Sequence, residues 1–141
     1  MHQHLWPEAY LAALAARDTP PSIHRRGGEL RLELAYEPEC VISTDAHDPA
    51  ARLALLDACG IDVAVISISS PCGVEALPVD EARPLLDAYH DGVSEVVAAS
   101  GGRLRAFAAA CLDAPDSGVA DVADRLAAGF AGLSLPSEAI A

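Results

Sequence analysis

Lysine is absent from this sequence of 141 residues, and all nine of its basic residues are arginines. This absence excludes two kinds of catalytic group: a lysine that forms a Schiff base with a substrate, and a carboxylated lysine that bridges two metal ions. The chain has 21 acidic residues and a formal net charge of −12 at pH 7. A chain this acidic repels the phosphate backbone of nucleic acids, so we predict no nucleic-acid partner.

Aromatic residues are also scarce, at 4% of the chain against 52% hydrophobic residues in all. The core must therefore be built from Ala, Leu, Val and Ile, which suits buried parallel strands covered by helices. The cysteines Cys40, Cys59, Cys72 and Cys111 form no Cys-x-x-Cys pair. That spacing argues against a zinc knuckle or a dithiol redox motif and predicts free thiols in a reducing compartment.

Long apolar runs are missing as well. No apolar stretch approaches the ~20 residues that a membrane span needs. Met1 is followed by His-Gln-His rather than by the charged and then apolar run of a signal peptide. We therefore predict a cytoplasmic protein with no membrane partner.

The first 47 residues follow an irregular pattern. Residues 7–17 carry apolar side chains at helical spacing, and a Thr-Pro-Pro sequence ends this predicted helix. In residues 30–36, leucines alternate with charged residues, which is the period of a half-exposed strand. Residues 41–42 are predicted as a short return strand, so this segment is expected to hold a small β-hairpin.

From residue 48 onward the pattern is regular. It predicts three helices: one capped by Asp48 and ended by Gly60, one over 80–100, and one from a cap at Asp116 to residue 128. It predicts strands over 61–69, 103–111 and, as a short one, 131–136, with a loop over 70–79. Strands that alternate with helices imply right-handed βαβ units and a parallel sheet. We predict an α/β fold with 1–141 in one domain.

Two architectures fit this alternation. One is a small doubly wound sheet, and the other is part of a (β/α)8 TIM barrel, which normally needs about 250 residues. Neither G-x-G-x-x-G nor a Walker A motif follows any predicted strand, which argues against nucleotide-binding forms of the open sheet. No G-x-S-x-G motif surrounds Ser69, Ser70 or Ser137, which disfavours a serine nucleophile.

His2 and His4 are separated by one residue. On an extended chain, both side chains point to the same side and can bind one divalent metal through ring nitrogens. A catalytic zinc typically takes three protein ligands and a water, so the pair predicts part of a metal site. From the spacing alone, two exposed histidines near a chain terminus are the alternative reading.

Several phrases resemble the amidohydrolase superfamily when they are taken in order. They are HQHLWP at residue 2, HDPAARLALLDACGIDVAVIS at residue 47, GGRLRAFAAACLDAPD at residue 101 and GFAGLSLP at residue 129. Within the superfamily the chain is most similar to the branch that contains aminocarboxymuconate semialdehyde decarboxylase and related hydrolases. There an H-x-H motif closes the first barrel strand, and the later phrases lead into the second, third and fourth strands.

This resemblance covers nearly the whole chain and implies the first four or so βα units of a (β/α)8 barrel. It implies that His2 and His4 bind a divalent metal, with Zn²⁺ as the first choice. The sequence departs from the family in lacking an apolar strand and an Asp before H-x-H. The family's other metal-binding and catalytic residues lie on later strands, so the catalytic residues are unknown here and are expected beyond Ala141.

Barrel geometry places the loops that follow strands on the catalytic face. Three residues in the loop after the first strand are therefore candidates for substrate binding: Trp6, Arg25 and His47. Arg25 belongs to a basic cluster with His24 and Arg26 that could hold a carboxylate, or lie in a solvated loop. Asp113 is read as an orienting residue or as an ordinary turn residue. His90 is predicted to be exposed on the outer side of its helix.

The resemblance implies a metal-dependent hydrolase or non-oxidative decarboxylase that acts on a small carboxylate, amide or lactone. In a different functional class, the chain is a non-catalytic half-barrel that self-associates, or that pairs with a missing C-terminal half. A third hypothesis is a complete small α/β binding module without a metal. Metal content and molecular mass in solution discriminate among the three.

Overall fold

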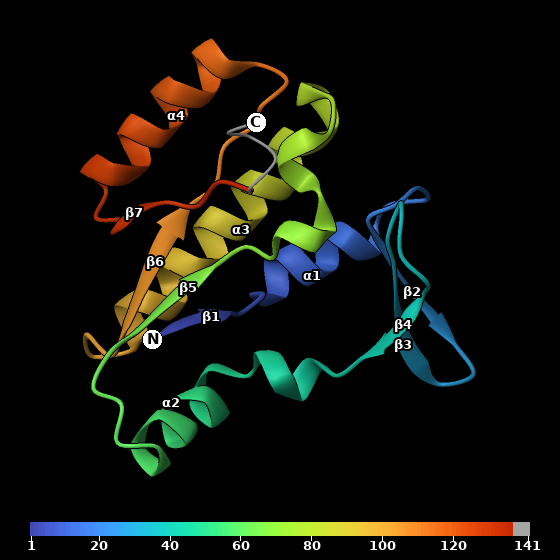
Figure 1. Cartoon of the computed structure of the whole chain (residues 1–141). Helices are drawn as coiled ribbons and strands as arrows, with labels where there is room; N and C mark the ends of the chain where they lie inside the picture. The colour runs from blue at the N-terminus through green and yellow to red at the C-terminus, as the bar shows by residue number, and fades with distance from the viewer. Residues whose placement is uncertain (137–141) are drawn as a thin grey trace.

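The computed structural model describes residues 1–136 and places its strands in two separate sheets (Figure 1). A parallel sheet contains, in order, β1 (His2–His4), β5 (Ala64–Ser67), β6 (Leu104–Ala108) and β7 (Gly132–Leu133). An antiparallel sheet contains β2 (Ser22–Arg26), β3 (Glu29–Glu33) and β4 (Cys40–Ile42). The predicted α/β class with a parallel sheet is confirmed.

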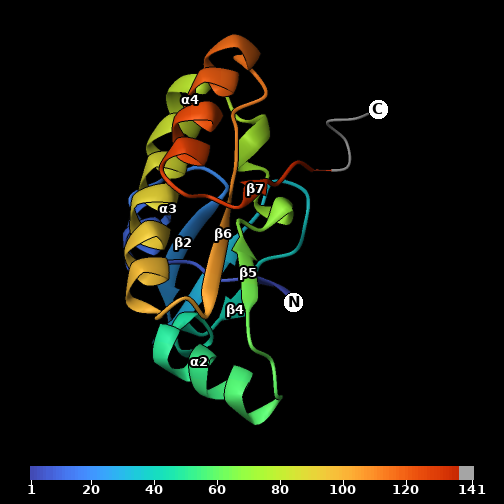
Figure 2. The same cartoon turned by 90° about the vertical axis from the view of Figure 1, so that its left-hand side faces the viewer.

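The strands of the parallel sheet follow one another in chain order, without a reversal. His2 pairs with Val65, and Val65 pairs with Arg105 on the next strand. Helix α3 (Val79–Ala99) and helix α4 (Pro115–Ala127) lie on the same side of β5 and β6 (Figure 2). One face of this sheet is therefore packed against helices, and the other is left open by the described residues.

The helices begin close to the predicted positions. Asp48 caps α2 (Pro49–Ala58), because its side chain accepts a hydrogen bond from the backbone N–H of Ala50 at 2.8 Å. The predicted cap at Asp116 is wrong. Helix α4 has Ala114 as its N-cap residue, without a side-chain cap hydrogen bond, and Asp116 lies in its first turn. Pro115 at the start of the helix has already fixed the helical backbone there.

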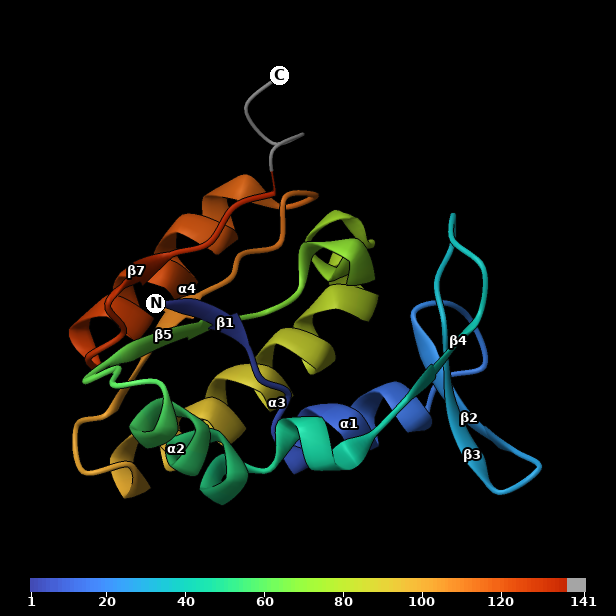
Figure 3. The same ribbon diagram turned by 60° about the horizontal axis from the view of Figure 1, so that its bottom comes forward.

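The segment between β1 and α2 contains helix α1 (Glu8–Ala15) and the antiparallel sheet, as the predicted helix and hairpin require. Strand β2 was not predicted, and it pairs with β3 in a five-residue register from Ser22–Glu33 to Arg26–Glu29. The antiparallel sheet lies well away from the parallel sheet in two views (Figures 1 and 3). A short 3-10 helix, η1 (Thr44–His47), leads from it into α2.

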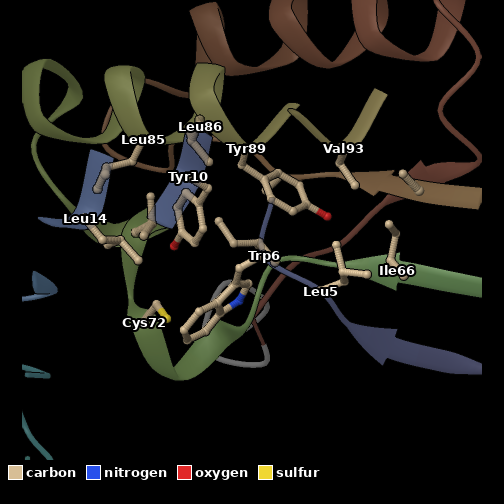
Figure 4. Close-up of a cluster of buried hydrophobic side chains, with 14 of the residues drawn as sticks. Leu5, Trp6, Tyr10, Leu14, Ile66, Cys72, Leu85, Leu86, Tyr89 and Val93 are labelled. Carbon is tan, nitrogen blue, oxygen red and sulfur yellow. The ribbon is translucent and has the colours of Figure 1, made fainter. Parts of the chain in front are cut away.

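The core lies between the helix-covered face of the parallel sheet and helices α1 and α3 (Figure 4). Tyr10 of α1 and Tyr89 of α3 meet edge to face at 5.9 Å, and both are fully buried. A Cβ added to Gly92 would lie 2.7 Å from the Cβ of Pro7, so glycine here allows α1 and α3 to approach closely. Within residues 1–136, no helix has the length and apolar character needed to cross a membrane.

The prediction that His90 is exposed is wrong. Its side chain lies in the core, and the residue is only 3% exposed. The ring nitrogen Nε2 accepts a hydrogen bond from the backbone N–H of Ala109 at 3.0 Å, and Phe130 packs edge-on against the ring at 5.4 Å. Helix α3 is thus covered by the segment after β6 as well as by the sheet, which makes its buried side wider than the sequence pattern suggests. Burial lowers the pKa of His90 to about 4.

Candidate functional site

Strand β1 is short, and the contacts that hold it come from distant parts of the chain. The backbone N–H of Val65 donates to the carbonyl of Met1 at 2.7 Å. Arg52 of α2 donates to Gln3 Oε1 at 2.9 Å and to the carbonyl oxygen of His4 at 3.4 Å. The sequence lacks an apolar run before H-x-H, and the strand is anchored instead by these bonds and by the fully buried Leu5 that follows it.

His2 and His4 lie next to each other on the open face of the parallel sheet. Their ring centroids are 5.0 Å apart, with the ring planes at 79°. Both residues are exposed, whereas Gln3 between them is only partly so, as expected from a strand in which alternate side chains face opposite sides. The prediction that the two imidazoles share one side is confirmed.

Ser67 lies beside His4 at the carboxyl end of β5 and contacts both rings. Its hydroxyl oxygen is 2.6 Å from Nε2 of His2 and 3.3 Å from Nδ1 of His4. Its backbone carbonyl oxygen is also 3.3 Å from Nδ1 of His4. Ser67 was not among the predicted site residues, although its place in the alternating segment 61–69 puts it on the same face as Val65.

Two imidazoles fit a divalent metal in donor chemistry but supply fewer ligands than a catalytic zinc typically takes. In the part of the chain that the structure describes, no group of three or more His, Cys, Asp and Glu side chains could hold a metal ion. One ring nitrogen of each histidine faces Ser67, so the other nitrogen of each ring is left to bind a ligand. The pair fits a partial metal site.

Trp6 and His47 form a second cluster. Their rings stack at 4.7 Å with an interplanar angle of 7°, and the backbone N–H of Trp6 donates to His47 Nδ1 at 3.1 Å. Burial and the nearby charge of Arg52 lower the pKa of His47. The two residues line a pocket of about 510 Å³ among α1, η1 and α3, whose lining does not include His2 or His4.

Arg25 lies on β2, in the antiparallel sheet rather than beside the histidine pair. Its guanidinium donates to the carbonyl of Gly28 at 3.3 Å. Its neighbours are held by acidic residues, with His24 at 3.1 Å from Glu33 of β3 and Arg26 at 3.6 Å from Glu39 just before β4. The structure does not bring this basic cluster together with the predicted metal ligands.

Asp113 is a cap residue. Its carboxylate accepts a hydrogen bond from the backbone N–H of Val79 at 3.2 Å, at the first residue of α3. This contact ties the segment after β6 to the start of α3. Of the three serines considered as nucleophiles, Ser137 lies outside the described residues.

Glu75 is a buried acid that the sequence pattern does not reveal. It lies in the 3-10 helix η3 (Val74–Ala76) and is 1% exposed, and within residues 1–136 neither of its carboxylate oxygens has a hydrogen-bond partner. Burial raises the pKa of Glu75. The indole N–H of Trp6 and the hydroxyl of Tyr10 are likewise buried without a hydrogen-bond partner in the described part of the chain.

Comparisons with known proteins leave the family open. Neither models of protein families nor curated proteins give a match to this chain. The resemblance to the amidohydrolase superfamily therefore rests on the motifs of the sequence.

Proposed function

We propose that the parallel sheet is half of a (β/α)8 barrel. Its strands run in chain order, whereas a doubly wound sheet reverses its strand order at a switch point. The helices α3 and α4 cover a single face, as on the outside of a barrel (Figure 2). The open face, with His2, His4 and Arg105, corresponds to the barrel interior in this proposal.

We further propose that the chain is the metal-binding part of a metal-dependent hydrolase or non-oxidative decarboxylase. The observation that carries this proposal is the pair of exposed imidazoles, 5.0 Å apart, on β1, with His4 at the carboxyl end of that strand. Active sites of such barrels lie at that end. His2 and His4 would hold a divalent metal, with Zn²⁺ as the first choice because imidazole nitrogen suits it.

A bound divalent metal would activate water or polarise a carbonyl or carboxylate of a small carboxylate, amide or lactone substrate. The residues of this chain would orient the metal and fix one edge of the site. Ser67 contacts both rings, and Arg52 joins the strand that carries them to α2. Trp6, Arg25 and His47 remain proposals for substrate binding, with Trp6 and His47 favoured by the pocket that they line.

Zinc titration by calorimetry tests the metal site. We expect one Zn²⁺ per chain for the wild-type protein, and loss of binding in both His2→Ala and His4→Ala. His24→Ala is a matched control, because His24 lies on β2 with Ser22 and Glu33 as its partners. Zinc binding that survives both substitutions, or a wild-type chain that binds no zinc, would refute the proposed site.

The second candidate function is a non-catalytic half-barrel that associates with a second copy of itself. The observation that favours it is a set of exposed apolar side chains in the segments that form the sheet: Val63 before β5, Leu133 in the edge strand β7 and Leu135 after it are 41%, 37% and 42% exposed. Half a barrel leaves core surface and strand edges for a partner to cover. The net charge of −12 opposes association, so added salt should strengthen it.

Light scattering on the eluting protein distinguishes the two candidates when it is combined with the zinc titration. A dimer without bound zinc supports the half-barrel without catalysis. A zinc-binding chain, whether monomer or dimer, supports the metal-dependent enzyme. A monomer that unfolds cooperatively and binds no zinc contradicts both and supports a small α/β binding module.

A further inference from the structure

Ser67 is the residue that both candidate metal ligands contact. Ser67 is fully buried, although it belongs to the open face of the sheet. A buried hydroxyl needs hydrogen-bond partners, because an unsatisfied one loses the water that would otherwise solvate it. Within residues 1–136 this hydroxyl has three partners, and two of them are the imidazoles.

A serine hydroxyl has one hydrogen to donate and two lone pairs to accept with. The hydrogen of Ser67 donates to the backbone carbonyl of Ile68 at 3.2 Å. With the hydrogen in this position, the oxygen accepts from His2 Nε2 at 2.6 Å and from His4 Nδ1 at 3.3 Å. In this arrangement both ring nitrogens carry a hydrogen, whereas a hydroxyl that donated to His2 Nε2 would place the hydrogen of that ring on Nδ1.

The backbone gives an independent constraint on His4. Its Nδ1 also lies 3.3 Å from the carbonyl oxygen of Ser67, and a carbonyl can only accept. Two acceptors of one residue thus face the same ring nitrogen. A neutral imidazole that holds its hydrogen on one nitrogen presents a lone pair on the other.

We propose that Ser67 is a positioning residue that fixes the tautomers of both histidines and leaves His2 Nδ1 and His4 Nε2 as the metal-binding atoms. The part of this inference that concerns metal rests on the proposed function, and the part that concerns tautomers does not. Metal-binding histidines commonly donate their other N–H to a neighbouring acceptor, which fixes the ring orientation and makes the ligand more basic. Here one residue provides that acceptor for two rings.

The tautomers can be read from ¹⁵N shifts of the imidazole nitrogens in the metal-free protein, at a pH where these shifts show neutral rings. We expect hydrogen on Nε2 of His2 and on Nδ1 of His4. Two other histidines are internal references with known partners. His47 accepts at Nδ1 and must be protonated at Nε2, whereas His90 accepts at Nε2 and must be protonated at Nδ1. Hydrogen on Nδ1 of His2 would overturn the inference without any variant being made.

Ser67→Ala separates the two rings. It removes the acceptor of His2 but keeps the carbonyl that holds His4, so we expect a mixture of tautomers for His2 and no change for His4. Zinc affinity should fall by about 10- to 100-fold, the usual loss when an outer partner of a ligand is removed. Ser67→Thr keeps the hydroxyl and should restore both properties.

Ser94→Ala is the matched control, because it removes a serine hydroxyl that donates to the carbonyl of His90 on α3. It should change neither the tautomers nor zinc affinity. Unchanged His2 shifts and zinc affinity in Ser67→Ala would overturn the role of Ser67. If the wild-type chain binds no zinc but shows the expected tautomers, the proposed function fails and the tautomer assignment stands.

Discussion

The two faces of the parallel sheet are built from the same strands but carry opposite chemistry. On the helix-covered face, Ile66, Leu104 and Ala106 are at most 4% exposed. On the open face, His2, His4 and Arg105 are exposed. The alternation of a strand allows this separation, since successive residues face opposite sides. One face can therefore stabilise the fold while the other is free to bind a metal or a partner.

Two neighbouring residues of β6 face opposite sides of the sheet, and substituting each of them tests this difference. Leu104→Ala should lower the free energy of unfolding by about 4 kcal/mol, because it removes a fully buried side chain and leaves a cavity. Arg105→Ala, on the opposite face, should change it by less than about 0.5 kcal/mol. Urea unfolding followed by circular dichroism measures both. A large loss for Arg105→Ala would show that the open face is covered in solution, which favours association of two copies.

The histidines show the same difference, because His90 is buried on the packed side while His2 and His4 are exposed on the open face. The pKa of His90 is about 4, below its ordinary value of 6.5. Unfolded chains therefore bind more protons than folded ones between these values, so stability is fully present above pH 6.5 and is lost as the pH falls toward 4. At about 1.4 kcal/mol per pH unit, the loss reaches about 3 kcal/mol.

The measurement is the free energy of unfolding as a function of pH for the wild-type protein and His90→Gln. Glutamine can still accept from the Ala109 N–H but does not titrate in this range, so the difference between the two profiles isolates His90. A wild-type slope in His90→Gln would contradict the assignment of this loss to His90.

The features that could be predicted from the sequence are those that depend on residues close together in the chain. Local patterns revealed the helices and strands after residue 48 and the shared side of His2 and His4, because both follow from the period of a helix or a strand. The role of Ser67 depends on the register of β1 against β5, which joins residues 63 positions apart and has no local signal. The burial of His90 depends on contacts with Ala109 and Phe130, and β2 depends on pairing with β3.

Arg52 gives the smallest expected effect and tests how the open face is held in place. It donates to Gln3 Oε1, to the carbonyl of His4 and to the carbonyl of Ala46 at 2.6 Å. Arg52→Ala should cost only about 1 kcal/mol, because the bonds are partly exposed to water. Its effect should be concentrated in β1, which carries both candidate ligands and has β5 as its partner strand.

Hydrogen exchange of the Val65 amide, which donates to Met1, reports on that strand directly. We expect faster exchange of the Val65 amide in Arg52→Ala. The amides of Ile66 and Ala106, two residues whose side chains lie on the covered face, should exchange at the wild-type rate. Arg52→Lys should be intermediate, because an ammonium lacks the planar fork that reaches several acceptors at once. Unchanged exchange at Val65 would mean that backbone pairing alone holds β1. In that case the open face would depend on the covered one for its order, and the two faces would be separate in chemistry but not in stability.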